Sequence, residues 1–138
     1  MCLSINKNVK LPKVQKDGYC IGYKVISKLN NDSLYHFYGY EIGVNKSTRE
    51  GKFLTQAEIS SGTVQKGFHI FLRLRTAKRA MYFKSGYYNF SSTRKIIKVS
   101  YKPEDVVALG TWEWSPISPH NVVVTEMLIK SLDHICKE

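Results

Sequence analysis

One segment of the chain repeats apolar residues at the spacing of an α-helix. Leu74, Ala77, Ala80 and Met81 recur every three or four residues, which places them on one face of a helix. The segments on either side are instead rich in β-branched and aromatic residues, which favour strands. The sequence therefore predicts an α+β fold, in which a mostly antiparallel sheet packs against one principal helix at about residues 73–84, with short helical turns elsewhere.

Local composition predicts several strands around this helix. They are residues 18–28, 33–44, 66–71, 94–101 and 121–129. The turn-forming residues 29–33 separate the first two strands, so these two are expected to form a hairpin. Residues 121–129 are predicted to be a single central strand. Residues 103–110 resemble one helical turn, because Pro103 is followed by two acidic residues and then by Gly110.

The length of 138 residues and the lack of a linker predict a single domain over residues 1–138. Residues 1–17 contain lysines at regular spacing and Pro12, and are expected to form a basic, partly extended N-terminal arm. The chain also has 9 Tyr, 6 Phe and 2 Trp, more rings than one small core buries easily. Surplus apolar surface usually marks an interface, so a homo-oligomer is expected.

Several classes of protein are disfavoured by what the sequence lacks. It has no run of about 18 apolar residues and no apolar signal segment at the N-terminus, so we expect a cytoplasmic protein, in the host cytoplasm if phage-encoded, without a membrane partner. Its three cysteines form no C-x-x-C pair, and its four histidines are far apart in sequence. No metal, cofactor or catalytic group is therefore predicted, although His69 lies between apolar neighbours on a predicted strand.

The positive charge is concentrated in one part of the chain. Residues 59–103 contain no Asp or Glu but carry ten of the 21 Lys and Arg residues, within a formal net charge of +10. Such a one-sided segment favours an anionic partner, either a phosphate-bearing small molecule or a nucleic acid. The alternative is a solvated basic surface that only aids solubility.

The predicted helix and the connection after it combine cations with aromatic rings. Rings can stack on a nucleotide base, an Asn amide can pair with a base edge, and Arg guanidinium groups bind phosphate. The candidate ligand-binding residues are His69, Arg75, Arg79, Tyr82, Tyr87, Tyr88, Asn89, Phe90 and Arg94. The alternative is that Phe90 and one tyrosine are core residues and that the remaining side chains are ordinary surface residues.

Three functions are compatible with these residues. The first is non-enzymatic binding and sequestration of a small cyclic or ADP-ribose-type nucleotide. The second is DNA or RNA binding through the acid-free residues 59–103. The third is a nucleotide-modifying enzyme that uses His69 or a carboxylate such as Glu58. The third is disfavoured, because no paired carboxylates and no nucleophile with an adjacent base are evident in the sequence.

Four short motifs also resemble a group of phage proteins. They are Met1–Cys2–Leu3, Tyr23–Lys24–Val25, Gly67–Phe71 followed by the helix that contains Ala77, and Asn121–Thr125. Together they look like small, largely uncharacterised proteins of phages and prophages. Phage proteins of this size include sponges that sequester the nucleotide signals of bacterial defence systems, and the resemblance implies an anti-defence role without assigning any residue to it.

Overall fold

The computed structural model describes residues 3–32, 39–47, 62–64, 67–82, 84–85, 88–89, 93–112 and 118–137. These residues form helix α2 (Leu74–Tyr82), the short 3₁₀ helix η2 (Pro103–Asp105) and a set of strands. The strands are β1 (Leu3–Ile5), β2 (Cys20–Ser27), β3 (Gly43–Lys46), β4 (Thr63–Val64), β5 (Phe68–Phe71), β6 (Lys84–Ser85), β7 (Tyr88–Asn89), β8 (Arg94–Tyr101), β9 (Val106–Trp112), β10 (Ser118–Val124) and β11 (Glu126–Ile129).

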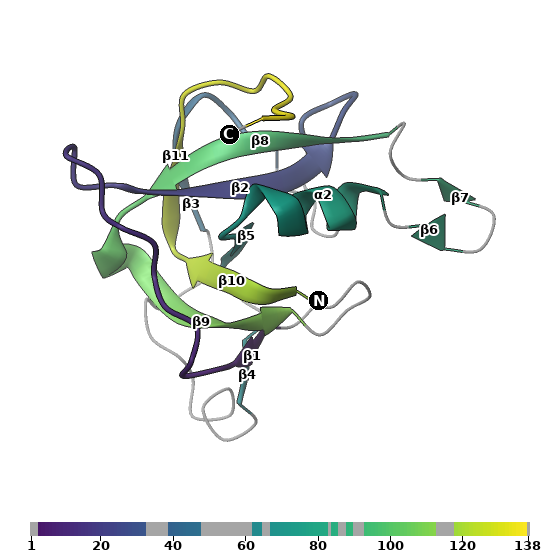
Figure 1. Cartoon of the computed structure of the whole chain (residues 1–138). Coiled ribbons are helices and arrows are strands. Elements are labelled where there is room, and N and C mark those ends of the chain that lie inside the picture. Colours follow the sequence, from purple (N-terminus) through teal and green to yellow (C-terminus); the bar gives the residue numbers. More distant parts are fainter. Residues whose placement is uncertain are drawn as a thin grey trace.

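Nine strands pair antiparallel in one sheet, in the order β3-β11-β8-β2-β5-β10-β9-β1-β4. The β2–β8 ladder is continuous from Cys20, which pairs with Tyr101, to Ser27, which pairs with Arg94. Figure 1 shows a curved sheet, with β2 and β8 on one side, β9 and β10 on the other, and α2 in front between them. Strands β6 and β7 form a separate hairpin just after α2. The predicted α+β fold, with a mostly antiparallel sheet and one principal helix, is confirmed.

The sheet buries apolar side chains on both of its faces. Successive residues of a strand point to opposite faces, so Cys20 and Ile26 of β2 join one core while Tyr23 and Val25 join the other. We call the first the inner core; it also contains Phe68, Ile70, Ile97, Val99, Tyr101, Val122, Val124, Met127 and Ile129. The second is the helix core, because it seats α2.

Helix α2 packs through its small and apolar residues. Ala77 and Ala80 are buried against β2 and β8, and their short side chains let the helix approach the sheet closely. Beside it, the rings of Phe71 and Trp112 meet edge to face, with centroids 5.2 Å apart. The apolar residues that recur in the sequence therefore form the face of α2 that packs against the sheet. The opposite face of the helix is exposed to solvent.

Three predictions of local structure differ from the structure: one strand, one helical turn and one hairpin. The predicted strand at residues 121–129 is two strands, β10 and β11, because the backbone turns at Thr125, whose N–H donates to the Asp105 carbonyl at 3.0 Å. The predicted helical turn at 103–110 is helical only in η2 and continues as β9. Finally, β2 pairs with β5 and β8 and not with β3, so the described part of residues 33–44 forms no hairpin with it. Residues 33–38 of this predicted strand lie outside the described residues.

Both terminal segments belong to the packed structure. Leu3 is fully buried, and β1 pairs with β9, a strand that the sequence analysis does not predict. Near the other end, the segment after β11 covers the edge of β8. The Ile96 N–H donates to Nδ1 of His134 at 3.0 Å, and the Ile135 N–H donates to the Ile96 carbonyl at 2.8 Å. Among the described residues, no helix is long and apolar enough to cross a membrane.

Close packing in the inner core requires a glycine in β2. A Cβ atom at Gly22 would overlap Cγ2 of Ile70 and lie 3.3 Å from Cε1 of Tyr101. We therefore expect Gly22→Ala to lower the free energy of unfolding by about 1–3 kcal/mol through overpacking, measured by urea denaturation. Ser27→Ala, at the end of the same strand, is the control and should change stability by less than about 0.5 kcal/mol. Equal stability of the two variants would contradict this account.

Candidate functional site

The solvent-facing side of α2 carries three cations and an aromatic ring. Arg75, Lys78, Arg79 and Tyr82 line one shallow depression together with Leu74, and we call these five residues the α2 face. Their spacing of three and four residues places them in one stripe along the helix. Tyr82 is 58% exposed, so its ring is accessible to a ligand.

The charges of the α2 face do not stabilise the helix that carries them. The first turn of α2 contains no acidic residue, and Arg75 lies there, next to the positive end of the helix dipole. Arg75 and Arg79 are like charges one turn apart, which destabilises a helix by a few tenths of a kcal/mol. None of the ion pairs between described residues involves an α2 cation. An anion bound to this face would offset both the repulsion between the two arginines and the unfavourable interaction of Arg75 with the helix dipole.

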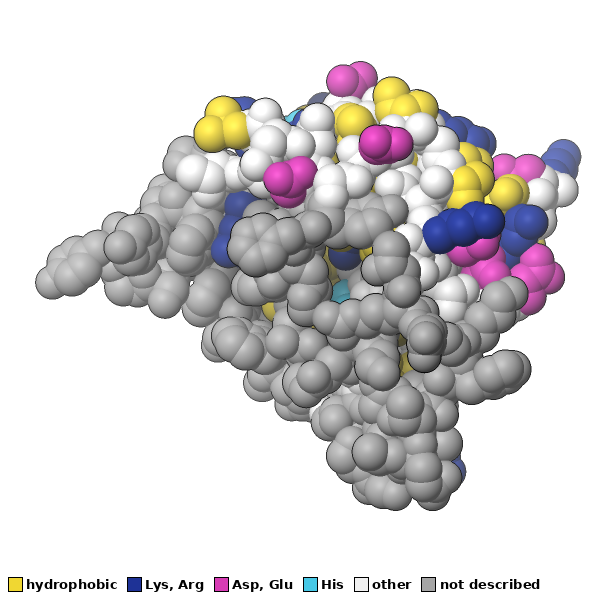
Figure 2. Space-filling model, turned by 180° about the vertical axis from the view of Figure 1, so that it is seen from behind, with side chains coloured by type: hydrophobic (Ala, Val, Ile, Leu, Met, Phe, Trp, Pro, Cys, Tyr) yellow, Lys and Arg dark blue, Asp and Glu magenta, His cyan; other side chains and the backbone are white. Residues whose placement is uncertain are grey.

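Charge is distributed differently on the opposite side of the molecule. Figure 2 shows Asp and Glu side chains beside Lys and Arg on that side. Among the described residues, Lys46 and Glu126, on the neighbouring strands β3 and β11, form an ion pair with an N–O distance of 3.7 Å. The cations of the α2 face thus differ from Lys46, whose charge has a carboxylate partner.

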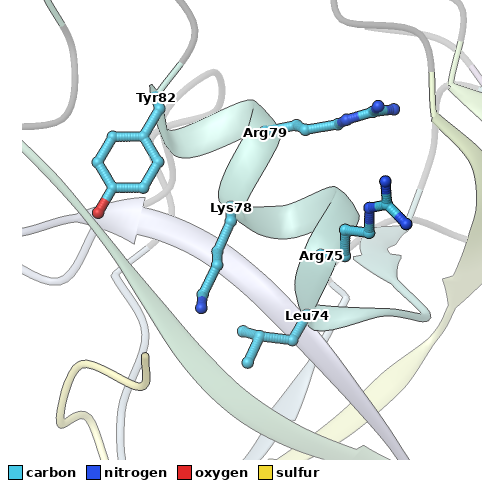
Figure 3. Close-up of a pocket in the computed structure, with 5 residues that line it drawn as sticks. All are labelled: Leu74, Arg75, Lys78, Arg79 and Tyr82. Carbon is cyan, nitrogen blue, oxygen red and sulfur yellow. The ribbon is translucent and has the colours of Figure 1, made fainter. Parts of the chain in front are cut away.

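The depression has a volume of about 480 Å³ and is lined mainly by side-chain carbon. In Figure 3 the side chains of Arg75 and Arg79 extend to one side of the helix, while Lys78 and Tyr82 extend to the other. A ligand that contacts both pairs must therefore lie across the helix. Lys78 and Leu74 are absent from the candidates predicted from the sequence, although Lys78 has the same helical spacing as its neighbours.

The remaining candidates on β8 and on the β6–β7 hairpin have other positions. Nη1 of Arg94 donates to the carbonyl of Ala80 at 3.3 Å, so Arg94 ties the last turn of α2 to the sheet. Tyr88 and Asn89 form β7, which pairs with β6 directly after α2. Tyr87 and Phe90 lie outside the described residues. The structure thus brings Arg75, Arg79 and Tyr82 together, with Arg94 as a support for their helix.

His69 does not line the α2 face. Its Nε2 lies 3.2 Å from the carbonyl oxygen of Val64, so the ring is turned toward β4. Burial, and then the charge of Lys24, lower the pKa of His69 from 6.5 to about 4, against the opposing effect of backbone carbonyls at Val64 and Gly67. The imidazole is therefore neutral at pH 7.

A second hollow, of about 220 Å³, lies between the N-terminal and C-terminal segments. Lys98 and Lys130 line it, but so does Asp17, whose carboxylate is 3.9 Å from the ammonium of Lys130. Its charge is therefore partly compensated, unlike that of the α2 face.

The described residues contain no metal-binding cluster and no reactive thiol at either hollow. No group of three or more His, Cys, Asp or Glu side chains in the described part of the chain could hold a metal ion. Cys20 is buried, burial raises the pKa of its thiol, and its Sγ is 3.8 Å from the Pro12 carbonyl oxygen. It is therefore a protonated core residue at neutral pH.

Comparison of the chain with protein-family models, with curated proteins and with solved structures finds no match in any of the three.

The low pKa of His69 makes the stability of the protein dependent on pH. Between pH 6.5 and about 4 the unfolded chain binds a proton that the folded chain excludes, so this contribution to stability is complete above pH 6.5 and is lost as the pH falls to about 4. The loss is at most about 3 kcal/mol. Urea denaturation at pH 7 and at pH 4.5 measures it.

His69→Gln is the matched variant, because an amide can still donate to the Val64 carbonyl but does not titrate. We expect it to lose clearly less stability than the wild-type protein over this pH range. An identical loss in both proteins would show that His69 does not cause the pH dependence.

Proposed function

We propose that the protein binds a small phosphate-bearing nucleotide on the α2 face and sequesters it without changing it chemically. The observation that supports this function is the convergence of Arg75, Lys78, Arg79 and Tyr82 on one depression that has no acidic side chain among its described lining residues. Its five lining residues include no carboxylate, histidine or thiol, so binding is the role that they suit best.

The spacing of the two arginines suits a phosphate. At 1.5 Å per residue, Arg75 and Arg79 are about 6 Å apart along the helix axis, so both guanidinium groups can reach one phosphate or pyrophosphate. A base could then lie against the exposed ring of Tyr82 on the other side of the helix. Stacking on an aromatic ring contributes about 1–3 kcal/mol per base and suits cyclic or ADP-ribose-type nucleotides.

DNA or RNA binding is the second candidate, and the positions of the β8 cations favour it less. A protein that follows a nucleic-acid backbone needs many cations along one track. Lys95 and Lys98 are three residues apart on β8, so strand alternation directs them to opposite faces of the sheet. Lys98 lines the second hollow with Asp17, away from the α2 face. The acid-free segment is thus divided between several surfaces.

A nucleotide-modifying enzyme has less support. His69 is turned toward the Val64 carbonyl and does not line the α2 face, and Glu58 lies outside the described residues. Sequestration of a nucleotide signal would give the protein an anti-defence role, in line with its resemblance to small phage proteins.

Loss of one arginine should weaken binding without unfolding the protein. Arg79→Ala removes one charged hydrogen bond, worth about 1.5–3 kcal/mol, so we expect affinity for ADP-ribose or a cyclic dinucleotide to fall by about ten- to a hundredfold in calorimetric titrations. Lys95→Ala on β8 removes the same charge from another surface and is the control. Equal affinities of the two variants, or no nucleotide binding by the wild-type protein, would contradict the proposal.

The dependence of affinity on salt separates the two candidates. A protein that follows a polymer backbone with six or more cations releases condensed counterions, so its affinity falls about a thousandfold or more between 50 and 200 mM salt. A small nucleotide condenses few ions, and stacking on Tyr82 is insensitive to salt, so we expect a much smaller decrease for the nucleotide. Tight, salt-sensitive binding to long DNA or RNA without affinity for nucleotides would instead favour the second candidate.

A further inference from the structure

The middle of β2 contains a buried lysine. Lys24 is 7% exposed, and its neighbours Tyr23 and Val25 are core residues. Strand alternation places Lys24 on the same side of the sheet as Cys20 and Ile26, which belong to the inner core. It therefore lies on the face opposite to α2 and does not belong to the α2 face.

The ammonium group of Lys24 has two described contacts. Its Nζ donates to the carbonyl oxygen of His69 at 2.8 Å and lies 5.4 Å from the centre of the Tyr40 ring. An ammonium carries three N–H donors, so two of them are not used by the His69 carbonyl. The two ion pairs between described residues, Lys46–Glu126 and Lys130–Asp17, do not include it. In the described part of the chain, Lys24 is therefore a buried cation without a carboxylate partner.

Burial of the Lys24 ammonium costs free energy, and packing at this position does not require a charged side chain. A buried ion is normally paired, because the protein interior replaces little of its hydration. A carbonyl and a ring face compensate part of that loss, but a hydrocarbon side chain of similar length would fill the same place without it. Stability of the fold alone therefore does not explain a lysine here.

The nearest titratable ring adds no second charge. His69 is neutral at pH 7, because burial and Lys24 itself lower its pKa to about 4. Lys24 thus provides a positive charge that no described carboxylate pairs with, in a buried position where an electrostatic attraction is stronger than at the surface.

We propose that Lys24 is the anchor of a second anion-binding site, which lies on the inner-core side of β2 and takes a phosphate or carboxylate group. The two remaining N–H donors bind oxygens of the anion, and the His69 carbonyl and the Tyr40 ring hold the ammonium in place. This site lies on the opposite face of the sheet from α2, and it does not rest on the proposed function of the α2 face.

The experiment uses a background in which the α2 face cannot bind anions. Arg75→Gln, Lys78→Gln and Arg79→Gln are combined in one protein, which we call the α2-neutral variant. Pyrophosphate is the probe, titrated at constant ionic strength while thermal unfolding is followed. A ligand that binds only the folded state raises the melting temperature as its concentration increases. We expect this rise in the α2-neutral variant, and we expect Lys24→Met, added to it, to abolish the rise.

Lys95→Met in the same background is the matched control, since it removes a lysine from the adjacent strand, and it should keep the rise. Without pyrophosphate, Lys24→Met should melt at the same temperature as the α2-neutral variant or higher, because it removes an unpaired buried charge. A rise that survives Lys24→Met overturns the proposal. So does a Lys24→Met protein that melts earlier or fails to fold, since Lys24 would then be a structural residue.

Loss of the rise in the α2-neutral variant itself also overturns the proposal, and it leaves the proposed function of the α2 face intact. If nucleotide binding at the α2 face fails but the pyrophosphate effect is retained in the α2-neutral variant, the proposed function is contradicted and the Lys24 site stands.

Discussion

The pairing of β2 with β8 is the interaction on which the rest of the structure depends. Their ladder runs unbroken from Cys20 and Tyr101 to Ser27 and Arg94, and it carries a core on each side. One face of these strands seats Ala77 and Ala80 of α2. The cations of the α2 face point to solvent because the alanines on the other side of the helix face this ladder. The same alternation turns Lys24 into the inner core, so one pair of strands positions both groups of charges.

The sequence predicted those features that depend on neighbours along the chain. Helix α2 follows from a local repeat of apolar residues, and β8 occupies the predicted residues 94–101 because its β-forming pattern is regular there. The break between β10 and β11 was not predictable, because most residues around Thr125 favour a strand and the turn depends on the carbonyl of Asp105. The pairing of the strands was also not predictable from local sequence, since β2 pairs with strands that lie far along the chain.

The candidate site also contains some features that the local sequence predicts and others that depend on contacts between distant segments. Arg75, Arg79 and Tyr82 converge because they belong to one helix, which their spacing alone indicates. Arg94 has a supporting contact with the Ala80 carbonyl that no spacing reveals, because it joins β8 to α2. Lys24 left only a faint signal, a single charge inside an apolar strand. The total charge of +10 therefore includes both exposed cations, such as Arg75 and Arg79, and the buried ammonium of Lys24, and composition cannot distinguish them.

The topology has a consequence for how the chain folds. The first strand pairs with β9, and β2 pairs with β8, so early segments bond to partners that follow them by about seventy residues or more. Contacts of such long sequence separation form slowly, because loop closure costs entropy before the pairing repays it. During synthesis, Cys20–Ser27 can complete its longest ladder only after Arg94–Tyr101 has left the ribosome, and until then part of its apolar surface stays uncovered. Kinetic competition with aggregation, more than final stability, should therefore limit the yield of folded protein at high expression.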